Sequence, residues 1–399
     1  MRSADWIDNL AVRASYGIQG NIDKNTSPYV MGTYKVEQIL PGNSENTIRV
    51  DSPPNDKLRW EKTQSVNAGL DFSVLDQAIS LGIDYYYRYS SDLIGTKMTP
   101  LETGFSSTTV NWATLRNQGI ELSLTTRNIH TKNFTWYTNF NIGYNNNKIL
   151  KMSVPANQTT PSLVGYPIGA IFAYPSAGLD SEGYPLFLNS AGEKVTAEQY
   201  FNMKNDGPDL TAEEHRALFK YIGTTEPLYS GGFTNTFTIK RFEIAVNCIF
   251  NLGQYVQTQP SYSITSYDRG MNTNRDILDR WTPSNPNGRF PALISDTKNG
   301  QSYRHNEYTA FNDLNYYNSM DTWVKKGNYM RIQSIRVGYK LPENWLKLFH
   351  MSSGSISLEG RNLFVVGSDY TNYLDPETMG NVYAQPIPKS VTFSLNLNF

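Results

Sequence analysis

Cysteine, charge and histidine are all scarce in this 399-residue sequence. Cys248 is the single cysteine, so the chain can hold neither an internal disulfide framework nor a thiolate metal cluster. Charged residues are 18% of the chain and the formal net charge is −1, which excludes the basic surface that a nucleic-acid partner needs. The first ten residues, MRSADWIDNL, show no signal peptide, and we therefore expect the natural N-terminus to lie upstream.

Long apolar runs are also missing, since none approaches the roughly 20 residues of a membrane-spanning helix. That absence leaves a membrane β-barrel open, because barrel strands alternate apolar and polar residues instead. Aromatic residues, by contrast, are abundant at 13%, with 27 Tyr, 18 Phe and 7 Trp. Such rings suit membrane–water interfaces and sugar-stacking surfaces about equally well.

The last nine residues, VTFSLNLNF, alternate apolar and polar side chains without exception, which predicts a strand with two unlike faces. The apolar row would face a core in a soluble sandwich, and lipid in a membrane barrel whose lumen meets the polar row. The same alternation predicts about ten strands, each close to or longer than the 9–11 residues of a tilted membrane strand. The ten segments are 11–18, 58–74, 79–89, 118–126, 134–146, 233–239, 242–252, 329–341, 355–366 and 387–399.

The connections between these segments alternate in length. Turns near residues 75, 130, 240 and 346 are short, whereas the connections at about 19–57, 93–112, 150–227, 259–327 and 367–386 are long and polar. A soluble sandwich has no reason to place every long loop at one end, but an outer-membrane barrel has short periplasmic turns and long extracellular loops. The sequence therefore predicts an all-β fold, an antiparallel transmembrane β-barrel segment with long extracellular loops.

One predicted strand departs from the pattern. In NYMRIQSIRVGYKL (328–341), Arg331 and Gln333 stand at the parity that Ile335 and Val337 fill further on. A β-bulge would explain the change, and so would a position above the edge of the bilayer.

Nine stretches, in order and over nearly the whole chain, carry a family resemblance. They are ASYGIQGN (14–21), LRWEKTQSVNAGLDFSV (58–74), LRNQGIELSL (115–124), GYPIGAIFAYPSAGLDSEGYPLF (165–187), YIGTTEPLYSGGFTNTFTIKRFEIAV (221–246), LDRWTPSNPNGRFPAL (278–293), NYMRIQSIRVGYKLP (328–342), RNLFVVGSDYTNYLDPE (361–377) and PIPKSVTFSLNLNF (386–399). They resemble the C-terminal barrel of TonB-dependent transporters of the SusC/RagA family. The terminal Phe399 resembles the aromatic end that outer-membrane barrels present to their assembly machinery.

The resemblance implies import of a bulky nutrient, a glycan fragment or a peptide, across the outer membrane of Bacteroidota-type bacteria. It also implies a SusD-like surface lipoprotein as a lid, outer-membrane lipid around the barrel, and energy delivered by the TonB complex. The family's N-terminal extension, TonB-contacting segment and plug have no counterpart in residues 1–399, and plugged transporters have 22 strands. We therefore expect the C-terminal part of a larger barrel, cut at a periplasmic turn just before Leu10, that would not transport alone.

Aromatic residues in the predicted loops are the candidates for contact with ligand or lid, because a flat ring with a polar tip stacks on a sugar or a peptide side chain. The alternative is that these rings pack the long loops against one another. The candidates are Tyr174, Tyr184, Trp281, Tyr316, Tyr317 and Trp323.

Residues for catalysis or metal binding are not evident, and we assign no catalytic residue, metal or cofactor. His130, His215, His305 and His350 are scattered, which favours surface loop positions. Acidic residues in Gly- and Pro-containing loops, among them Asp375 and Glu377, form no calcium-loop pattern and are expected to be solvated. TAEEHRALF (211–219) carries a capping box and PENWLKLF (342–349) a proline start, so each predicts a short helix.

Two other interpretations stay open. Ten is an even number, so the strands would be allowed to close as a complete small outer-membrane barrel, either an adhesin or an omptin-like protease. A soluble secreted glycan-binding β-protein is the third interpretation, and it requires the apolar rows to face each other.

Overall fold

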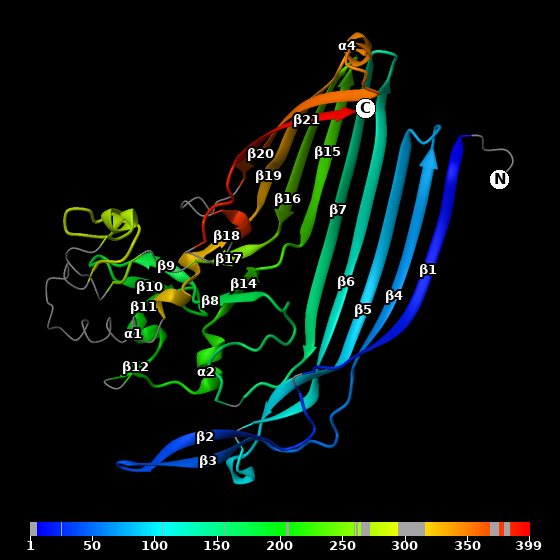
Figure 1. The fold of residues 1–399 in the computed structure, drawn as a ribbon. Helices are drawn as coiled ribbons and strands as arrows, with labels where there is room; N and C mark the ends of the chain where they lie inside the picture. Colours follow the sequence, from blue (N-terminus) through cyan, green and yellow to red (C-terminus); the bar gives the residue numbers. More distant parts are fainter. Residues whose placement is uncertain are drawn as a thin grey trace.

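The computed structural model describes residues 6–24, 26–105, 107–155, 157–204, 207–258, 260, 262–264, 272–293, 316–367, 375–378 and 384–399. Its main feature is one ten-stranded antiparallel sheet in the order β1-β4-β5-β6-β7-β15-β16-β19-β20-β21. Figure 1 shows this sheet as a tall, curved wall with β1 and β21 at its two edges.

All ten predicted strands are confirmed, and most run longer than their apolar rows. The bounds are β1 Ile7–Asn21, β4 Glu61–Val74, β5 Ile79–Met98, β6 Ser107–His130, β7 Phe134–Lys151, β15 Tyr229–Ile239, β16 Phe242–Leu252, β19 Tyr329–Lys340, β20 Ser353–Val366 and β21 Ser390–Asn398.

The register of the wall sorts polar and apolar side chains onto opposite faces. One polar row runs in register across six strands through Arg13, Gly69, Asp84, Glu121, Gly143 and Ser230. On the other face the apolar row is bare, with Val12 78%, Val391 73% and Phe393 66% exposed. A soluble sandwich would cover this row with a second sheet, and no sheet of the described residues does so.

The short turns, the start of β1 and the end of β21 lie at one end of the wall, and the long connections lie at the other (Figure 1). The β4–β5 turn is tight because Leu75, Asp76 and Gln77 all adopt positive φ angles, at 57°, 53° and 58°. The β19–β20 connection holds the predicted helix, α4 (Glu343–Leu348), with Pro342 at its N-cap. The predicted alternation of connection lengths is therefore confirmed in space.

Two long connections differ from the prediction. The connection 19–57 contains a protruding hairpin, β2 (Met31–Leu40) paired with β3 (Asn43–Ser52). The connection 93–112 was predicted too long, because β5 continues to Met98 and β6 begins at Ser107, with only η1 (Leu101–Thr103) between them. Register shifts around Leu93 break the strict alternation while the ladder of strand pairs continues.

The described parts of the connections 152–228 and 253–328 fold together into one unit, called here the loop body. Tyr174 joins the two, since its N–H donates to the carbonyl of Ser319 (2.8 Å) and its carbonyl accepts from the N–H of Asp321 (2.9 Å). The predicted helix at 211–219 is α2, with the capping box of Thr211 and Glu214 formed. Among the described residues, no helix is long and apolar enough to cross a membrane.

The loop body is built from short elements. They are β8 Ala170–Ala173, β9 Ser176–Leu179, β10 Pro185–Leu188, β11 Lys194–Thr196, α1 Ala197–Tyr200, β12 Met203–Lys204, β13 Gly207–Pro208, α2 Ala212–Ala217, β14 Lys220–Thr224, β17 Tyr255–Gln257, η2 Arg275–Asp279, η4 Tyr317–Ser319, η5 Asp321–Trp323 and β18 Val324–Lys326. In the last long connection the structure describes η6 (Pro376–Thr378).

Candidate ligand-binding site

A β-bulge in β19 decides which way Arg331 points. Cys248 of β16 pairs with Ile332 and Asn247 pairs with Ser334, so Gln333 is an extra residue in the strand. The bulge shifts the parity by one, which puts Arg331 on the same polar face as Ser334. Of the two explanations that the sequence left open, the bulge is confirmed.

On that face Arg331 is buried beneath the β20–β21 connection, which supplies two carboxylates that contact it. Its side chain is 2% exposed and forms ion pairs with Asp375 and Glu377. The Asp375 carboxylate also accepts the backbone N–H groups of Glu377 (3.0 Å) and Ile387 (3.1 Å). The prediction that Asp375 and Glu377 are solvated turn acids was therefore wrong, because these carboxylates tie the last connection to the wall.

Hydrogen bonds and the Arg331 guanidinium stabilise the ionised form of the buried Asp375 carboxylate. Burial alone would raise the pKa of this carboxyl group. The backbone N–H of Glu377, the Arg331 guanidinium and the N–H of Ile387 outweigh burial and lower the pKa below its ordinary value. Asp375 thus stays ionised and paired near neutral pH.

The polar face of the wall is hollowed and mostly uncharged. A cavity of about 780 Å³ runs along it from β5 to β19. Eight of its nineteen described lining residues carry an amide or a hydroxyl group, including Asn139, Asn141 and Asn247, while Asp84 and Glu121 are its acidic members. Beside it, the Arg13 guanidinium lies 3.0 Å from Asp84 and 3.1 Å from Asp71. A surface of this kind offers hydrogen bonds to a passing polar molecule without one dominant charge.

Four of the aromatic residues named from the sequence, Tyr174, Tyr316, Tyr317 and Trp323, lie in the hydrophobic core cluster of the loop body, and Trp281 is buried outside that cluster. Tyr174, Trp281, Tyr316, Tyr317 and Trp323 are each 1–8% exposed, and the half-buried Tyr184 packs against the same cluster. Two stacked pairs hold the core, Tyr174 on Phe219 (ring centroids 4.2 Å apart) and Tyr316 on Phe201 (4.1 Å). These are the packing contacts of the alternative interpretation, and contact of the six rings with ligand or lid stays a prediction.

Two polar groups inside the loop body are satisfied by hydrogen bonds. His215 is buried, which corrects the expected surface position, and its ring nitrogens lie 3.2 Å from the Thr159 carbonyl and 3.1 Å from the Tyr316 hydroxyl. Burial raises the pKa of Tyr200 to about 12, so its hydroxyl keeps its proton and donates to the Leu218 carbonyl (2.6 Å). No group of metal-binding side chains occurs among the described residues. His305 lies outside them.

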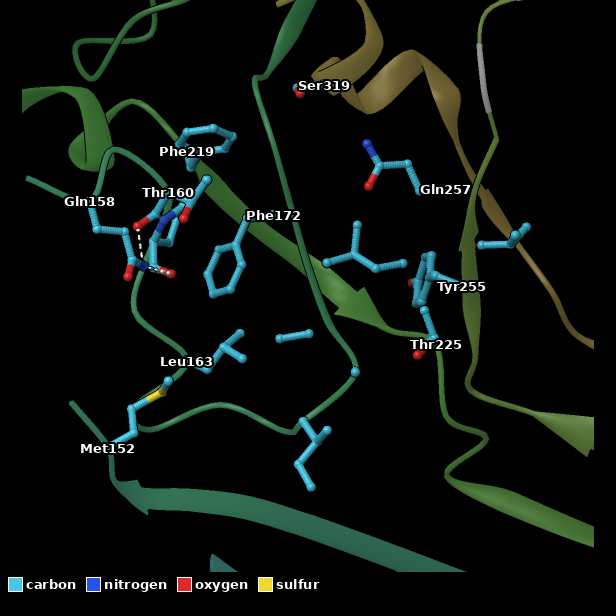
Figure 2. Close-up of a pocket in the computed structure, with 16 residues that line it drawn as sticks. Met152, Gln158, Thr160, Leu163, Phe172, Phe219, Thr225, Tyr255, Gln257 and Ser319 are labelled. Carbon is cyan, nitrogen blue, oxygen red and sulfur yellow. Dashed lines mark hydrogen bonds between the residues drawn. The ribbon is translucent and has the colours of Figure 1, made fainter. Parts of the chain in front are cut away.

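A second cavity, of about 700 Å³, opens within the loop body and is called here the loop pocket (Figure 2). One side is formed by Met152 and residues 158–163, and the other side is β17 with Tyr255 and Gln257. Phe172 of β8 lies between the two sides. The sixteen lining residues are Met152, Gln158, Thr160, Pro161, Leu163, Ile168, Gly169, Ala170, Ile171, Phe172, Phe219, Thr225, Tyr255, Val256, Gln257 and Ser319.

The walls of the loop pocket are fixed by contacts behind them. Arg216 of α2 donates to the Gln158 carbonyl, and the amide of Gln158 donates to the Thr160 carbonyl (2.8 Å). Gly223 of β14 lies directly against the ring of Tyr255, where any Cβ atom would collide with that ring. No local sequence pattern predicts this pocket, because its two sides come from different connections.

A smaller cavity of about 270 Å³ lies between the loop body and the wall. Tyr255 lines it as well as the loop pocket, together with Tyr221, Asn145 and Asn147. Asn147 belongs to β7, and it joins the two regions by accepting the N–H of Ile168 (2.8 Å) and donating to Glu226. The loop body is thus anchored on the polar face of the wall.

Comparison with known proteins identifies the class. Residues 3–363 match the family described as TonB dependent receptor-like, beta-barrel, and the chain belongs to that family. Proteins of this family are outer-membrane proteins, so the bare apolar row of the wall faces lipid. The resemblance to TonB-dependent transporters is therefore confirmed.

Relatives among characterised proteins narrow the class further. The chain is 27% identical to TonB-dependent receptor P3 of Formosa agariphila, over 94% of this chain and 36% of the receptor. It is 26% identical to TonB-dependent receptor SusC of Bacteroides thetaiotaomicron, over 100% of this chain and 38% of SusC. The chain therefore spans less than half the length of these relatives.

A solved structure supports the fold over the whole chain. The RagAB peptide transporter superposes with a TM-score of 0.75 at 22% sequence identity, covering 100% of this chain and 42% of the transporter chain. The open ten-stranded wall thus has the form of part of a TonB-dependent barrel.

Proposed function

We propose that this chain supplies part of the barrel wall and the ligand-contacting loops of a TonB-dependent importer for a bulky nutrient, a glycan fragment or a peptide. The observation that carries the proposal is the contrast between the two faces of the wall. A lipid-facing apolar row backs a hollowed polar face, and an ordered loop body is anchored on that face at Asn147. This arrangement suits a lumen that admits a polar cargo from the long-loop end, which we assign to the outside of the cell.

Closure of the barrel requires strands beyond the ten described here. β1 and β21 stand at opposite edges of the sheet and do not pair with each other. An open edge within a bilayer leaves backbone N–H and C=O groups without partners, which costs roughly several kcal/mol for each group. We propose that further strands of a larger barrel pair with both edges.

The proposal includes two partners. A SusD-like surface lipoprotein would sit over the long-loop end as a lid, and the TonB complex would supply the energy for import. The TonB partner is supported by the name TonB-dependent receptor that the matched relatives carry, and the SusD-like partner by the similarity to SusC. Outer-membrane lipid surrounds the wall, and the exposed Phe399 would serve as the barrel-assembly signal.

Uptake in the host organism tests the import function. We expect deletion of the gene to reduce uptake of at least one radiolabelled glycan or peptide at least tenfold, and complementation to restore it. A protonophore should abolish the same uptake, because TonB draws on the proton gradient. If no glycan or peptide shows a protonophore-sensitive loss on deletion, the import proposal is wrong.

Heat-modifiable gel mobility tests barrel closure separately. The 399-residue chain, refolded in detergent, should migrate alike with and without boiling, because its edges are open. A compact, faster band in the unboiled sample would show that the ten strands close alone, as an autonomous small barrel.

A further inference from the structure

We propose that the loop pocket is a subsite for an uncharged saccharide ring of the imported ligand. The inference rests on the proposed import function and narrows its cargo from a glycan or a peptide to a neutral glycan. It is carried by the chemistry of the pocket lining, by the aromatic surfaces in it, and by the way its walls are held.

Among the sixteen lining residues that the structure describes, none is Asp, Glu, Lys or Arg. A free peptide brings a terminal amine and a terminal carboxylate, and burying either without an opposite charge is costly. An acidic sugar brings the same difficulty. A neutral sugar brings only hydroxyl groups and C–H faces, so the absence of charge in the lining favours it.

The polar groups of the pocket match hydroxyl groups on opposite sides of a ring. Gln158 and Gln257 lie across the cavity from each other, and Thr160 and Thr225 add hydroxyls (Figure 2). The Nε2 of Gln158 donates to the Thr160 carbonyl (2.8 Å) and that of Gln257 to the Asn318 carbonyl (3.1 Å). Within the described residues no hydrogen bond uses the Oε1 atom of either side chain, so each amide keeps an acceptor for a ligand hydroxyl.

Aromatic rings give the pocket its apolar surfaces. Phe172 lies between the two sides of the pocket and Tyr255 lies on the β17 side, and the C–H face of a sugar packs on such rings. Phe172 is held edge-on by Tyr166 (centroids 4.9 Å apart) and lies 5.7 Å from Tyr221. The cavity volume of about 700 Å³ lies within the range of roughly 300–1,000 Å³ that ligand pockets occupy.

The site is preorganised, because hydrogen bonds and close packing fix its walls. Arg216 and His215 of α2 hold the 158–159 backbone from behind, and Gly223 lets the Tyr255 ring lie flat against β14. Tyr255 also lines the cavity that leads to Asn145 and Asn147 of the wall. A short oligosaccharide would therefore extend from the loop pocket towards the polar lumen.

Isothermal titration of the full-length gene product in detergent tests the subsite. The probes are maltotriose, cellotriose and xylotriose as neutral trisaccharides, trigalacturonate as an acidic one, and the tripeptide Ala-Ala-Ala. We expect at least one neutral trisaccharide to bind more tightly than trigalacturonate and trialanine. Gln257→Leu and Gln158→Leu should each weaken that binding at least tenfold, because a site built to hydrogen-bond a hydroxyl loses affinity when its partner is removed.

The matched control is Gln38→Leu, an exposed position in the β2–β3 hairpin, which should leave the affinity within twofold. Gly223→Ala is a second variant that keeps every lining side chain but displaces the Tyr255 ring, and it should also weaken binding. Retained heat-modifiable mobility shows that each variant is folded. Preference for trialanine or trigalacturonate, no binding of any neutral trisaccharide, or unchanged affinity in both glutamine variants would overturn the subsite.

The outcomes separate this inference from the import function. If gene deletion abolishes energy-dependent uptake but the glutamine variants bind and import normally, the importer stands and the subsite is wrong. If Gln257 proves necessary for trisaccharide binding but deletion affects no uptake, the subsite stands and the import proposal is wrong.

Discussion

The wall and the loop body belong to one chain but follow opposite packing rules. In the wall the large apolar side chains point outward and remain bare, as with Val391 at 73% exposure. In the loop body the large apolar side chains are packed inside, and Phe187, Phe201 and Ile264 are all 0% exposed. The wall therefore depends on lipid for its stability, whereas the loop body carries a hydrophobic core of its own.

The two regions also place charge differently. Arg13 and Arg331 each contact two carboxylates on the polar face of the wall. The Arg13 side chain is 54% exposed, while that of Arg331 is 2% exposed where the last long connection covers it. One arginine between two carboxylates is thus a surface network at Arg13 and a buried tether at Arg331, and the following changes test that contrast.

Deletion of Gln333 should have the largest effect. Without the extra residue of the bulge, the strand segment before it reverses its faces, so Arg331 turns towards lipid and loses Asp375 and Glu377. We expect no assembled receptor in the outer membrane, measured by surface labelling and heat-modifiable mobility. Gln333→Ala keeps the residue count and should assemble; assembly of the deletion variant would contradict the assigned register.

Phe201→Ala should destabilise the loop body by about 3–5 kcal/mol, because it removes a fully buried ring and leaves a cavity. The measurement is limited proteolysis of the loops in urea, with the mobility of the barrel followed in parallel. Phe393→Ala on the lipid face removes the same ring without leaving a cavity, so its effect should be smaller. Equal effects of the two changes would mean that the loop body has no core of its own.

Arg331→Met should cost about 3–5 kcal/mol, since it leaves the buried Asp375 carboxylate without its partner. Adding Asp375→Asn and Glu377→Gln should recover most of the loss, and hydrogen exchange at the Ile387 N–H reports whether the connection is released. Because the folded pKa of Asp375 lies below its ordinary 3.8, its contribution is present above that pH and fades as pH falls through the lower folded value. Exchange at Ile387 that accelerates already between pH 7 and 5 would contradict the ionic tether.

Arg13→Met should have the smallest effect, below about 1 kcal/mol, because exposed ion pairs contribute little. The urea midpoint of the full-length protein, compared with that of Arg331→Met, gives the difference directly. A cost equal to that of Arg331→Met would show that Arg13 is buried in the assembled receptor.

Local alternation was enough to predict the wall, because apolar and polar residues alternate within each strand and so identify its two faces. The alternation pattern failed to predict the faces near Leu93 and Gln333. There an extra residue exchanges the apolar and polar positions of the strand, and only the pairing with the partner strand shows which residue is extra. The packing of the loop body could not be predicted from local sequence patterns. Tyr174 and Tyr316 meet with ring centroids 5.7 Å apart although they come from different connections, and no local pattern distinguishes a ring in such a core from a ring that meets ligand.

The loop body also has a mechanical consequence. It is built from the β7–β15 and β16–β19 connections, so in addition to the strand ladders it links four consecutive strands of the wall. In β1 to β6, by contrast, neighbouring strands are joined by hydrogen-bond ladders and by connections that lie outside the loop body. Bending of the wall is therefore expected among β1 to β6 rather than across the four strands that the loop body links.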